Sequence, residues 1–226
     1  MKKISLLFSL LVLVATSCTP SNEERAEELV SNCIKDYLTY PDSYEAISTV
    51  VDSASVDVSK IEETLRYAKE VVEIGATISS IESNMELTQI SLDIYAPDDY
   101  FYTEYSRRQY ERAEAEMAEY ELEMERATED LQDAVAKLRD ANSAIYTDEV
   151  NGWSVVHRFR SKGDNGEQLP PQEMIFFCDM EFEHCQGWTS RQYELISGII
   201  EDINDSETTD ELLDNLEDVR FLLLLL

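Results

Sequence analysis

The stretch from Tyr110 to Ile145, YERAEAEMAEYELEMERATEDLQDAVAKLRDANSAI, decides the fold of this chain. Apolar residues recur in it at every seventh position, and a second set, mainly alanine, follows three positions later. Such a repeat predicts a helix that packs along a seam against another helix, and small residues in the seam allow close approach. The seam consists of Tyr110, Met117, Met124, Leu131, Leu138 and Ile145, with Ala113, Tyr120, Ala127, Ala134 and Ala141.

The preceding segment supplies a partner for this helix, which we expect over residues 103–146. Ser59-x-x-Glu62 has the spacing of a capping box, and Ala96-Pro97-Asp98-Asp99 is a turn sequence. Two seams joined by a short turn favour an antiparallel hairpin over residues 59–146. A coiled coil between chains is the alternative use of the same seam. The second seam consists of Ile61, Leu65, Ala68, Val72, Gly75, Ile78, Ile81, Met85, Thr88 and Leu92.

Shorter elements flank the hairpin. A helix with an N-terminal capping box is expected over residues 21–38, and residues 45–51 form a β-branched run that predicts a strand. Apolar and polar residues alternate over 153–160, and an apolar run follows at 174–178, a pattern typical of a β-hairpin. Helices are expected again from residue 189 onward.

These elements predict an α+β fold, mainly α. In it, a long antiparallel, coiled-coil-like helical hairpin is inserted in a small domain with a short antiparallel sheet. The expected organisation is a signal peptide (1–17), a lipidated cysteine and tether (18–22), the N-terminal helix and strand of the small domain (23–58), the helical hairpin (59–146), the β-hairpin of the small domain (147–188) and C-terminal helices (189–226).

The N-terminus predicts where the protein resides. Met1-Lys2-Lys3 is a positive segment, and the eleven apolar residues from Ile4 to Val14 reach only about 16 Å as a helix, too short to span a bilayer. This is the pattern of a signal peptide. Ala15-Thr16-Ser17-Cys18 resembles a bacterial lipobox, in which the cysteine thiol receives a lipid. We therefore expect palmitate on Cys18 and an anchor in the cell envelope, most simply the outer membrane; an ordinary secretory signal is the alternative.

The charge of the chain limits its partners. It contains 48 acidic and 18 basic residues, a formal charge of −30, which becomes −32 when residues 1–17 and their two lysines are removed. Proteins that bind nucleic acid neutralise phosphates with clustered Lys and Arg, so this balance argues against nucleic acid as a partner. The expected partners are the membrane, through the lipid, and another protein or a second copy, through the hairpin.

The remaining cysteines are Cys33, Cys178 and Cys185. In an extracytoplasmic chain, Cys178 and Cys185 are a candidate disulfide that closes a short loop. A pairing with Cys33, or three free thiols, remains open. The spacing of Cys178, His184 and Cys185 does not match a zinc motif, so we expect no metal.

Three basic residues stand close together in an otherwise acidic chain. Arg158, Arg160 and Lys162 fall on one strand face, where they are either a docking point for an acidic partner or a glycan, or partners of neighbouring acids. His157 alternates with apolar residues and is expected in the core.

No nucleophile elbow, P-loop, dinucleotide fingerprint or His-Glu-x-x-His motif occurs, so we expect no enzyme activity and no cofactor.

Two motifs outside the hairpin, Pro41-Asp42-Ser43-Tyr44-Glu45 and Gly152-Trp153 with His157-x-Phe159-Arg160, follow the lipobox. In this order they resemble a family of small Bacteroidetes lipoproteins that has no established activity, so the resemblance implies a lipoprotein and no site residues. The leading hypothesis is a structural or interaction protein that uses the hairpin. A ligand-binding or protein-binding module around Trp153, Phe159 and Trp188 is the alternative, and a hydrolase of envelope polymers is less favoured.

Overall fold

The computed structural model describes residues 20–97 and 103–223. These residues form two compact units, one made of 20–54 and Asn151–Thr189 and the other of Ser55–Val150 and 190–223. The first is built around a sheet and the second of helices, so the α+β, mainly α, fold class is confirmed. The predicted signal peptide and Cys18 lie outside the described residues.

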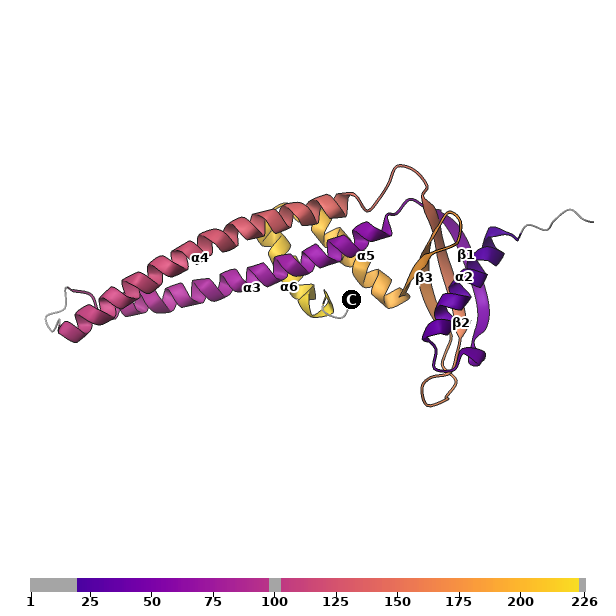
Figure 1. The fold of residues 1–226 in the computed structure, drawn as a ribbon, viewed down its shortest axis with the longest axis horizontal. Helices are drawn as coiled ribbons and strands as arrows, with labels where there is room; N and C mark the ends of the chain where they lie inside the picture. Colours follow the sequence, from indigo (N-terminus) through magenta and orange to yellow (C-terminus); the bar gives the residue numbers. More distant parts are fainter. Residues whose placement is uncertain (1–19, 98–102, 224–226) are drawn as a thin grey trace, which may run out of the picture. The chain divides into compact units, whose positions relative to one another are not determined.

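The sheet unit begins with helix α2 (Asn22–Tyr37) and the short 3₁₀ helix η1 (Pro41–Ser43). Four strands, β1 (Glu45–Ala54), β2 (Gly152–Arg160), β3 (Gln172–Asp179) and β4 (Cys185–Thr189), pair in that order and are all antiparallel. Helix α2 lies beside the sheet (Figure 1). Its apolar side packs into a core formed by Ala26, Val30, Ile34, Val155, Phe159, Phe176, Cys178 and Phe182.

The alternation in β2 explains which face of the sheet is covered. Val155, His157 and Phe159 are buried, whereas Arg158 and Arg160 are exposed, as the period of two predicts. The sequence reasoning missed β4, because Cys185–Thr189 contains a glycine and lacks an apolar and polar alternation. Its pairing with β3 is what holds this segment extended.

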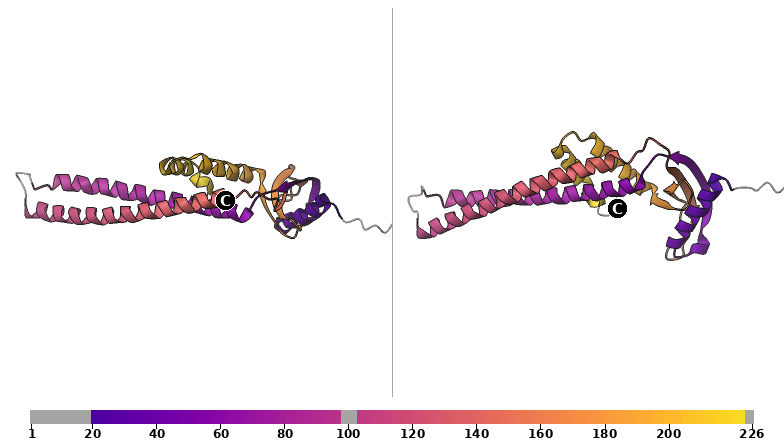
Figure 2. Two further views of the ribbon diagram at one scale, coloured as in Figure 1. Left: turned by 90° about the horizontal axis from the view of Figure 1, so that it is seen from above. Right: turned by 45° about the horizontal axis from the view of Figure 1, so that its top comes forward.

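The helical unit contains α3 (Val58–Ile94), α4 (Glu104–Ser143), α5 (Ser190–Asp205) and α6 (Thr209–Leu223). Helices α3 and α4 run side by side in opposite directions (Figures 1 and 2), so the antiparallel pairing within one chain is confirmed. Tyr95 at the end of α3 meets Tyr105 at the start of α4 edge to face, with ring centroids 6.1 Å apart. The turn predicted at residues 96–99 lies partly outside the described residues.

The main core of this unit lies at one end of the hairpin, where α5 and α6 cover it. Leu138, Leu212 and Leu216 are completely buried there, and each stabilises the unit by about 1.5–3 kcal/mol relative to an exposed side chain. Leu223, one residue of the C-terminal leucine run, joins the same core. Beyond this core, α3 and α4 continue as a pair (Figure 2).

The start of α3 and the end of β1 differ from the prediction. Asp57, rather than Ser59, is the N-cap of α3, and its carboxylate accepts from the backbone N–H of Ser59. The prediction that Ser59-x-x-Glu62 forms the capping box of this helix is therefore wrong. The reason is that the Asp57 N–H donates to the carbonyl of Ile145 at 2.8 Å, which holds the chain extended up to the helix start. Strand β1 is also longer than predicted and ends at Ala54, because β2 pairs with it as far as Gly152.

Candidate functional site

A chain of hydrogen bonds crosses the sheet unit between α2 and the sheet. The Tyr44 hydroxyl lies 2.6 Å from Nε2 of His157 and 2.6 Å from Oγ of Ser31. On the other side of the imidazole, Nδ1 lies 3.0 Å from the Thr49 hydroxyl, which donates to a carboxylate oxygen of Glu27 at 3.1 Å. We call these five residues the His157 network. It connects α2, β1 and β2 through polar side chains.

The directions of the hydrogen bonds in the network follow from the Thr49 proton together with a neutral imidazole. The Thr49 hydroxyl has a single hydrogen, which goes to Glu27, so Thr49 accepts from Nδ1–H of His157. Burial lowers the pKa of His157 and so favours the neutral imidazole, whose Nε2 carries a lone pair. In that state Nε2 accepts from Tyr44, and the Tyr44 oxygen accepts from Ser31. Burial also raises the pKa of Tyr44.

This network has the chemistry of a structural element. His157 is completely buried and both of its ring nitrogens are engaged, so the imidazole is not accessible to a substrate. The other histidine, His184, is exposed in the turn between β3 and β4. The hydrolase hypothesis required a histidine beside carboxylates in a pocket, and the position of His157 does not meet that requirement.

Three thiols lie close together beside the C-terminal half of α2. Sγ of Cys33 lies 2.9 Å from Sγ of Cys185, and Cys178 is the direct neighbour of Cys185 across strands β3 and β4. All three are free thiols in this structure. Burial, followed by the contact with Cys185, raises the pKa of Cys33 to about 12. The contact with Cys178, followed by burial, raises the pKa of Cys185 further. From the sequence, Cys178 and Cys185 were the candidate disulfide. The spacing of the cysteines gave no indication that Cys33 lies close to Cys185.

An apolar cavity of about 460 Å³ adjoins the thiols. Of the three aromatic residues proposed as a binding surface, Phe159 is buried against this cavity. Trp153 and Trp188 are half-buried, because Trp153 stacks on Phe182 and Trp188 meets Phe177 edge to face. The aromatics therefore pack against the unit and do not form one exposed surface. Residues that line the cavity include Cys33, Leu38, Phe159, Met174, Phe176 and Cys185.

The basic residues Arg158, Arg160 and Lys162 are all exposed. Arg158 lies directly across from Glu173 of β3, and Arg160 lies across from Glu45 of β1. Opposite charges at such cross-strand positions attract each other. Each arginine thus has an acidic residue opposite it in the sheet, and the use of this cluster as a docking point stays a prediction.

Helix α3 has an exposed apolar stripe near its C-terminal end. Leu87, Ile90 and Ile94 are 65, 53 and 61 % exposed, and their spacing of three and four residues places them on one side of the helix. We call these three residues the α3 stripe. The buried residues Ile81 and Thr88 lie on a different side, at positions of the predicted seam. The spacing of these three residues is present in the sequence. They do not belong to the predicted seam of α3, so the sequence pattern did not identify them as a surface.

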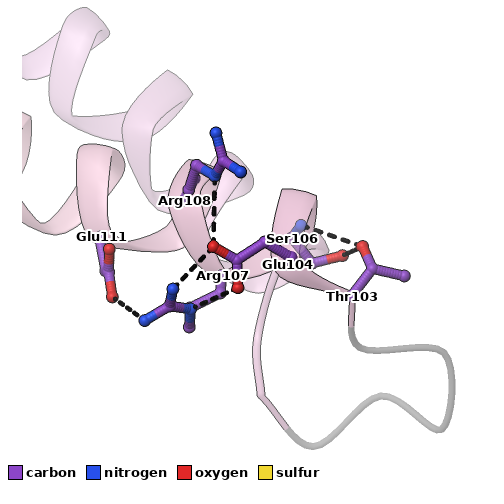
Figure 3. Close-up of polar contacts among 6 residues, drawn as sticks. All are labelled: Thr103, Glu104, Ser106, Arg107, Arg108 and Glu111. Atoms are coloured by element: carbon purple, nitrogen blue, oxygen red, sulfur yellow. Dashed lines mark hydrogen bonds and ion pairs between the residues drawn. The ribbon is translucent and has the colours of Figure 1, made fainter.

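The first turns of α4, at the same end of the hairpin, have their charges compensated within the helix (Figure 3). Arg107 donates to both carboxylate oxygens of Glu104, at 2.7 and 3.1 Å, and Arg108 lies 3.4 Å from the same carboxylate. The hydrogen bond from Arg107 is the main cause that lowers the pKa of Glu104. Arg107 also lies 3.5 Å from Glu111. This basic cluster therefore does not form an uncompensated positive patch.

No family model matches the chain, and neither does any curated protein or solved structure. Within residues 20–97 and 103–223, none of the helices has both the length and the apolar character needed to cross a membrane.

Proposed function

We propose that the protein is a lipid-anchored lipoprotein of the bacterial cell envelope, without enzyme activity, that binds another protein through the α3 stripe. The lipobox at Cys18, the short apolar segment before it and the resemblance to small Bacteroidetes lipoproteins support the anchor. The membrane proposed for it is the outer membrane. The single observation that carries the binding function is the exposure of Leu87, Ile90 and Ile94.

The composition around the stripe supports its use as a contact surface. Glu82, Glu86 and Asp93 are the only charged residues between Thr77 and Ile94, whereas the facing part of α4 is densely charged. A long exposed helix in water gains solubility from charge, so a nearly uncharged apolar side is costly unless a partner covers it. The stripe therefore offers apolar area that a partner can bury.

The expected partner is an amphipathic helix with basic residues along one edge. At 100° per residue, Glu82, Glu86 and Asp93 lie along one side of the stripe, so lysine or arginine on the partner helix would face them. Leucine-like residues spaced by three and four would pack on Leu87, Ile90 and Ile94. A second copy fits less well, because two processed chains of charge −32 repel each other.

The anchor is tested by labelling cells with a palmitate analogue. The full chain is expected to incorporate the label, Cys18→Ala to lose it and Cys33→Ala to retain it, because only the lipobox cysteine is acylated. Protease treatment of whole cells then distinguishes a surface-exposed chain from a periplasmic one. An unlabelled full chain contradicts the anchor.

The binding function is tested with a defined probe. A synthetic helical peptide with a leucine stripe and lysines on one edge is titrated onto the full chain, and fluorescence anisotropy is measured. Replacing Ile90 by Glu is expected to weaken binding at least tenfold, whereas Leu122→Glu, at an exposed apolar position of α4, leaves it unchanged. A version of the peptide with glutamates at the edge is expected to bind more weakly.

Two results would overturn this proposal. One is equal binding of the lysine peptide to the full chain and to Ile90→Glu. The other is a dimer, measured by sedimentation, that Ile90→Glu dissociates, because the stripe would then be a contact between copies. In cells, a photo-crosslinker at position 90 should capture one protein, and a crosslinker at position 122 should not capture it.

The cavity beside Cys33 and Cys185 supports a second candidate function, the binding of a small apolar ligand. It is concave and lined mainly by apolar side chains, which is typical of ligand sites. Saturable binding of an alkyl-chain ligand, measured by isothermal titration calorimetry and lost when Met174 is replaced by Asp, would support it.

A further inference from the structure

The sulfur atoms of Cys33 and Cys185 lie too close for an ordinary packing contact. Their separation of 2.9 Å is well inside the distance of about 3.5–4.0 Å at which non-bonded heavy atoms normally pack. A disulfide bond is about 2.0 Å long, so bond formation requires a movement of less than about 1 Å. The two residues belong to α2 and β4, elements of the same unit.

We infer that Cys33 and Cys185 form a disulfide in the oxidised protein, and that Cys178 stays a thiol. The inference rests on the geometry of the sheet unit and not on the α3 stripe. The envelope location proposed above would supply the oxidising environment. The bond would join residues that are 152 positions apart and would tie α2 to the edge strand of the sheet.

Cys178 is the alternative partner of Cys185, and the register of the sheet is compatible with it. The Asp179 N–H donates to the carbonyl of His184, the residue directly opposite, so these two form a hydrogen-bonded pair. Hydrogen-bonded and non-hydrogen-bonded pairs alternate, and Cys178 with Cys185 is therefore a non-hydrogen-bonded pair. In such pairs the Cα atoms lie about 4.5 Å apart, within the range for a disulfide, so the register allows this pairing. The 2.9 Å contact between the sulfur atoms of Cys33 and Cys185 is what favours Cys33 as the partner.

Access to an oxidant also favours Cys33. Cys33 and Cys185 are half-buried and line the apolar cavity, whereas Cys178 is only 5 % exposed. Within the described part of the chain, no three His, Cys, Asp or Glu residues are arranged to hold a metal ion, so the close thiols are not explained as a ligand set. The 2.9 Å approach of the two thiols places them in position to form a covalent bond.

The oxidant is a disulfide, either of a thiol oxidoreductase or of a small thiol such as glutathione. Cys33 loses its proton, and its thiolate attacks one sulfur of the oxidant and releases the other half as a thiol. The Cys185 thiolate then attacks Sγ of Cys33 in this mixed disulfide and releases the second half. Two protein thiols are oxidised and one external disulfide is reduced to two thiols, which take up the two protons. The raised pKa of Cys33 makes the first step slow at neutral pH.

The pairing is tested by peptide mapping of the full chain after incubation with oxidised glutathione. Remaining thiols are alkylated, and linked peptides are identified by mass spectrometry without reduction. The expected product is a Cys33–Cys185 crosslink, both in the unchanged chain and in Cys178→Ala. Reduction is expected to lower the unfolding temperature of both proteins by roughly 10 °C, and to leave that of Cys33→Ala unchanged.

The mapping decides the outcome even if a variant fails to fold. A dominant Cys178–Cys185 crosslink in the unchanged chain would overturn the inference, and so would complete alkylation of Cys33 and Cys185 after prolonged oxidation. Because purified protein is used, these results do not depend on the proposed anchor or on the proposed binding partner.

Discussion

The Tyr44 hydroxyl donates to Nε2 of His157 across 2.6 Å and thereby joins two sequence motifs that lie 113 residues apart. Tyr44 belongs to Pro41-Asp42-Ser43-Tyr44-Glu45, and His157 lies in the strand motif that begins at Gly152. The same two motifs also meet where Glu45 lies opposite Arg160 in the β1–β2 register. Both motifs therefore have a structural explanation, because they hold α2 and η1 against the sheet.

Replacing Tyr44 by Phe is expected to destabilise the sheet unit by about 1–3 kcal/mol. The change leaves Nε2 of His157 without its donor and removes the acceptor of the Ser31 hydroxyl, and both of these groups are buried. Urea unfolding measures the effect. Tyr37→Phe is the control, because Tyr37 is 91 % exposed, and it should change stability by less than about 0.5 kcal/mol. Equal stability of the two variants would contradict the role of the network.

The stability of the sheet unit is expected to fall as the pH drops below about 6.5, the ordinary pKa of histidine. Burial lowers the pKa of His157 in the folded state, so the unfolded chain binds the proton more strongly. The loss begins near the unfolded pKa, grows as the pH falls towards the lower folded pKa, and has a slope of at most about 1.4 kcal/mol per pH unit. The Glu27 carboxylate, reached through Thr49, favours the charged imidazole and opposes the effect of burial only in part.

Unfolding between pH 5 and 7.5 measures this slope. His157→Gln is less stable at every pH but should lack the part of the slope that comes from His157. His184→Gln serves as the control because His184 is exposed, and it should keep the full slope. An unchanged slope in His157→Gln would show that other groups cause the pH dependence.

Two glycine substitutions are expected to act in opposite directions. A Cβ at Gly152 would lie 2.4 Å from the backbone oxygen of Cys178 on the neighbouring strand, so Gly152→Ala should separate β2 from β3 and cost about 1–3 kcal/mol. A Cβ at Gly198 in α5 meets no atom of the described residues within 4 Å, so Gly198→Ala should stabilise the helical unit by about 0.5–1 kcal/mol. Thermal unfolding followed by circular dichroism tests both, and destabilisation by Gly198→Ala would contradict the packing of α5.

Replacing Thr64 by Val is expected to stabilise the helical unit by about 1 kcal/mol. Thr64 is completely buried in α3, and its hydroxyl has no hydrogen-bond partner among the described residues. Valine has nearly the same shape and helix propensity and removes the unsatisfied group. Thr128→Val, at an exposed position of α4, is the control and should change stability by less than about 0.5 kcal/mol. A lower denaturation midpoint for Thr64→Val would indicate that the hydroxyl has a partner.

Much of the secondary structure followed from spacing alone. The seven-residue repeat predicted α4, and Leu131, Leu138 and Ala134 are buried where it placed them. Alternation in β2 predicted that His157 and Phe159 face the core. These predictions succeed because the side that a residue faces depends only on its position within a helical turn or along a strand. The short strand β4 was missed because its residues carry no such repeat and become a strand only by pairing with β3.

The sequence by itself determined which segments are helices, which side of each is apolar and how the two long helices pair. Only the tertiary structure decided which distant residues meet: Tyr44 with His157, and Cys33 with Cys185. It also placed the C-terminal helices in the same unit as the hairpin. The physical reason is that periodicity is set by neighbours within a few residues, whereas a contact between residues 113 or 152 positions apart depends on strand register and helix docking, which no local spacing specifies.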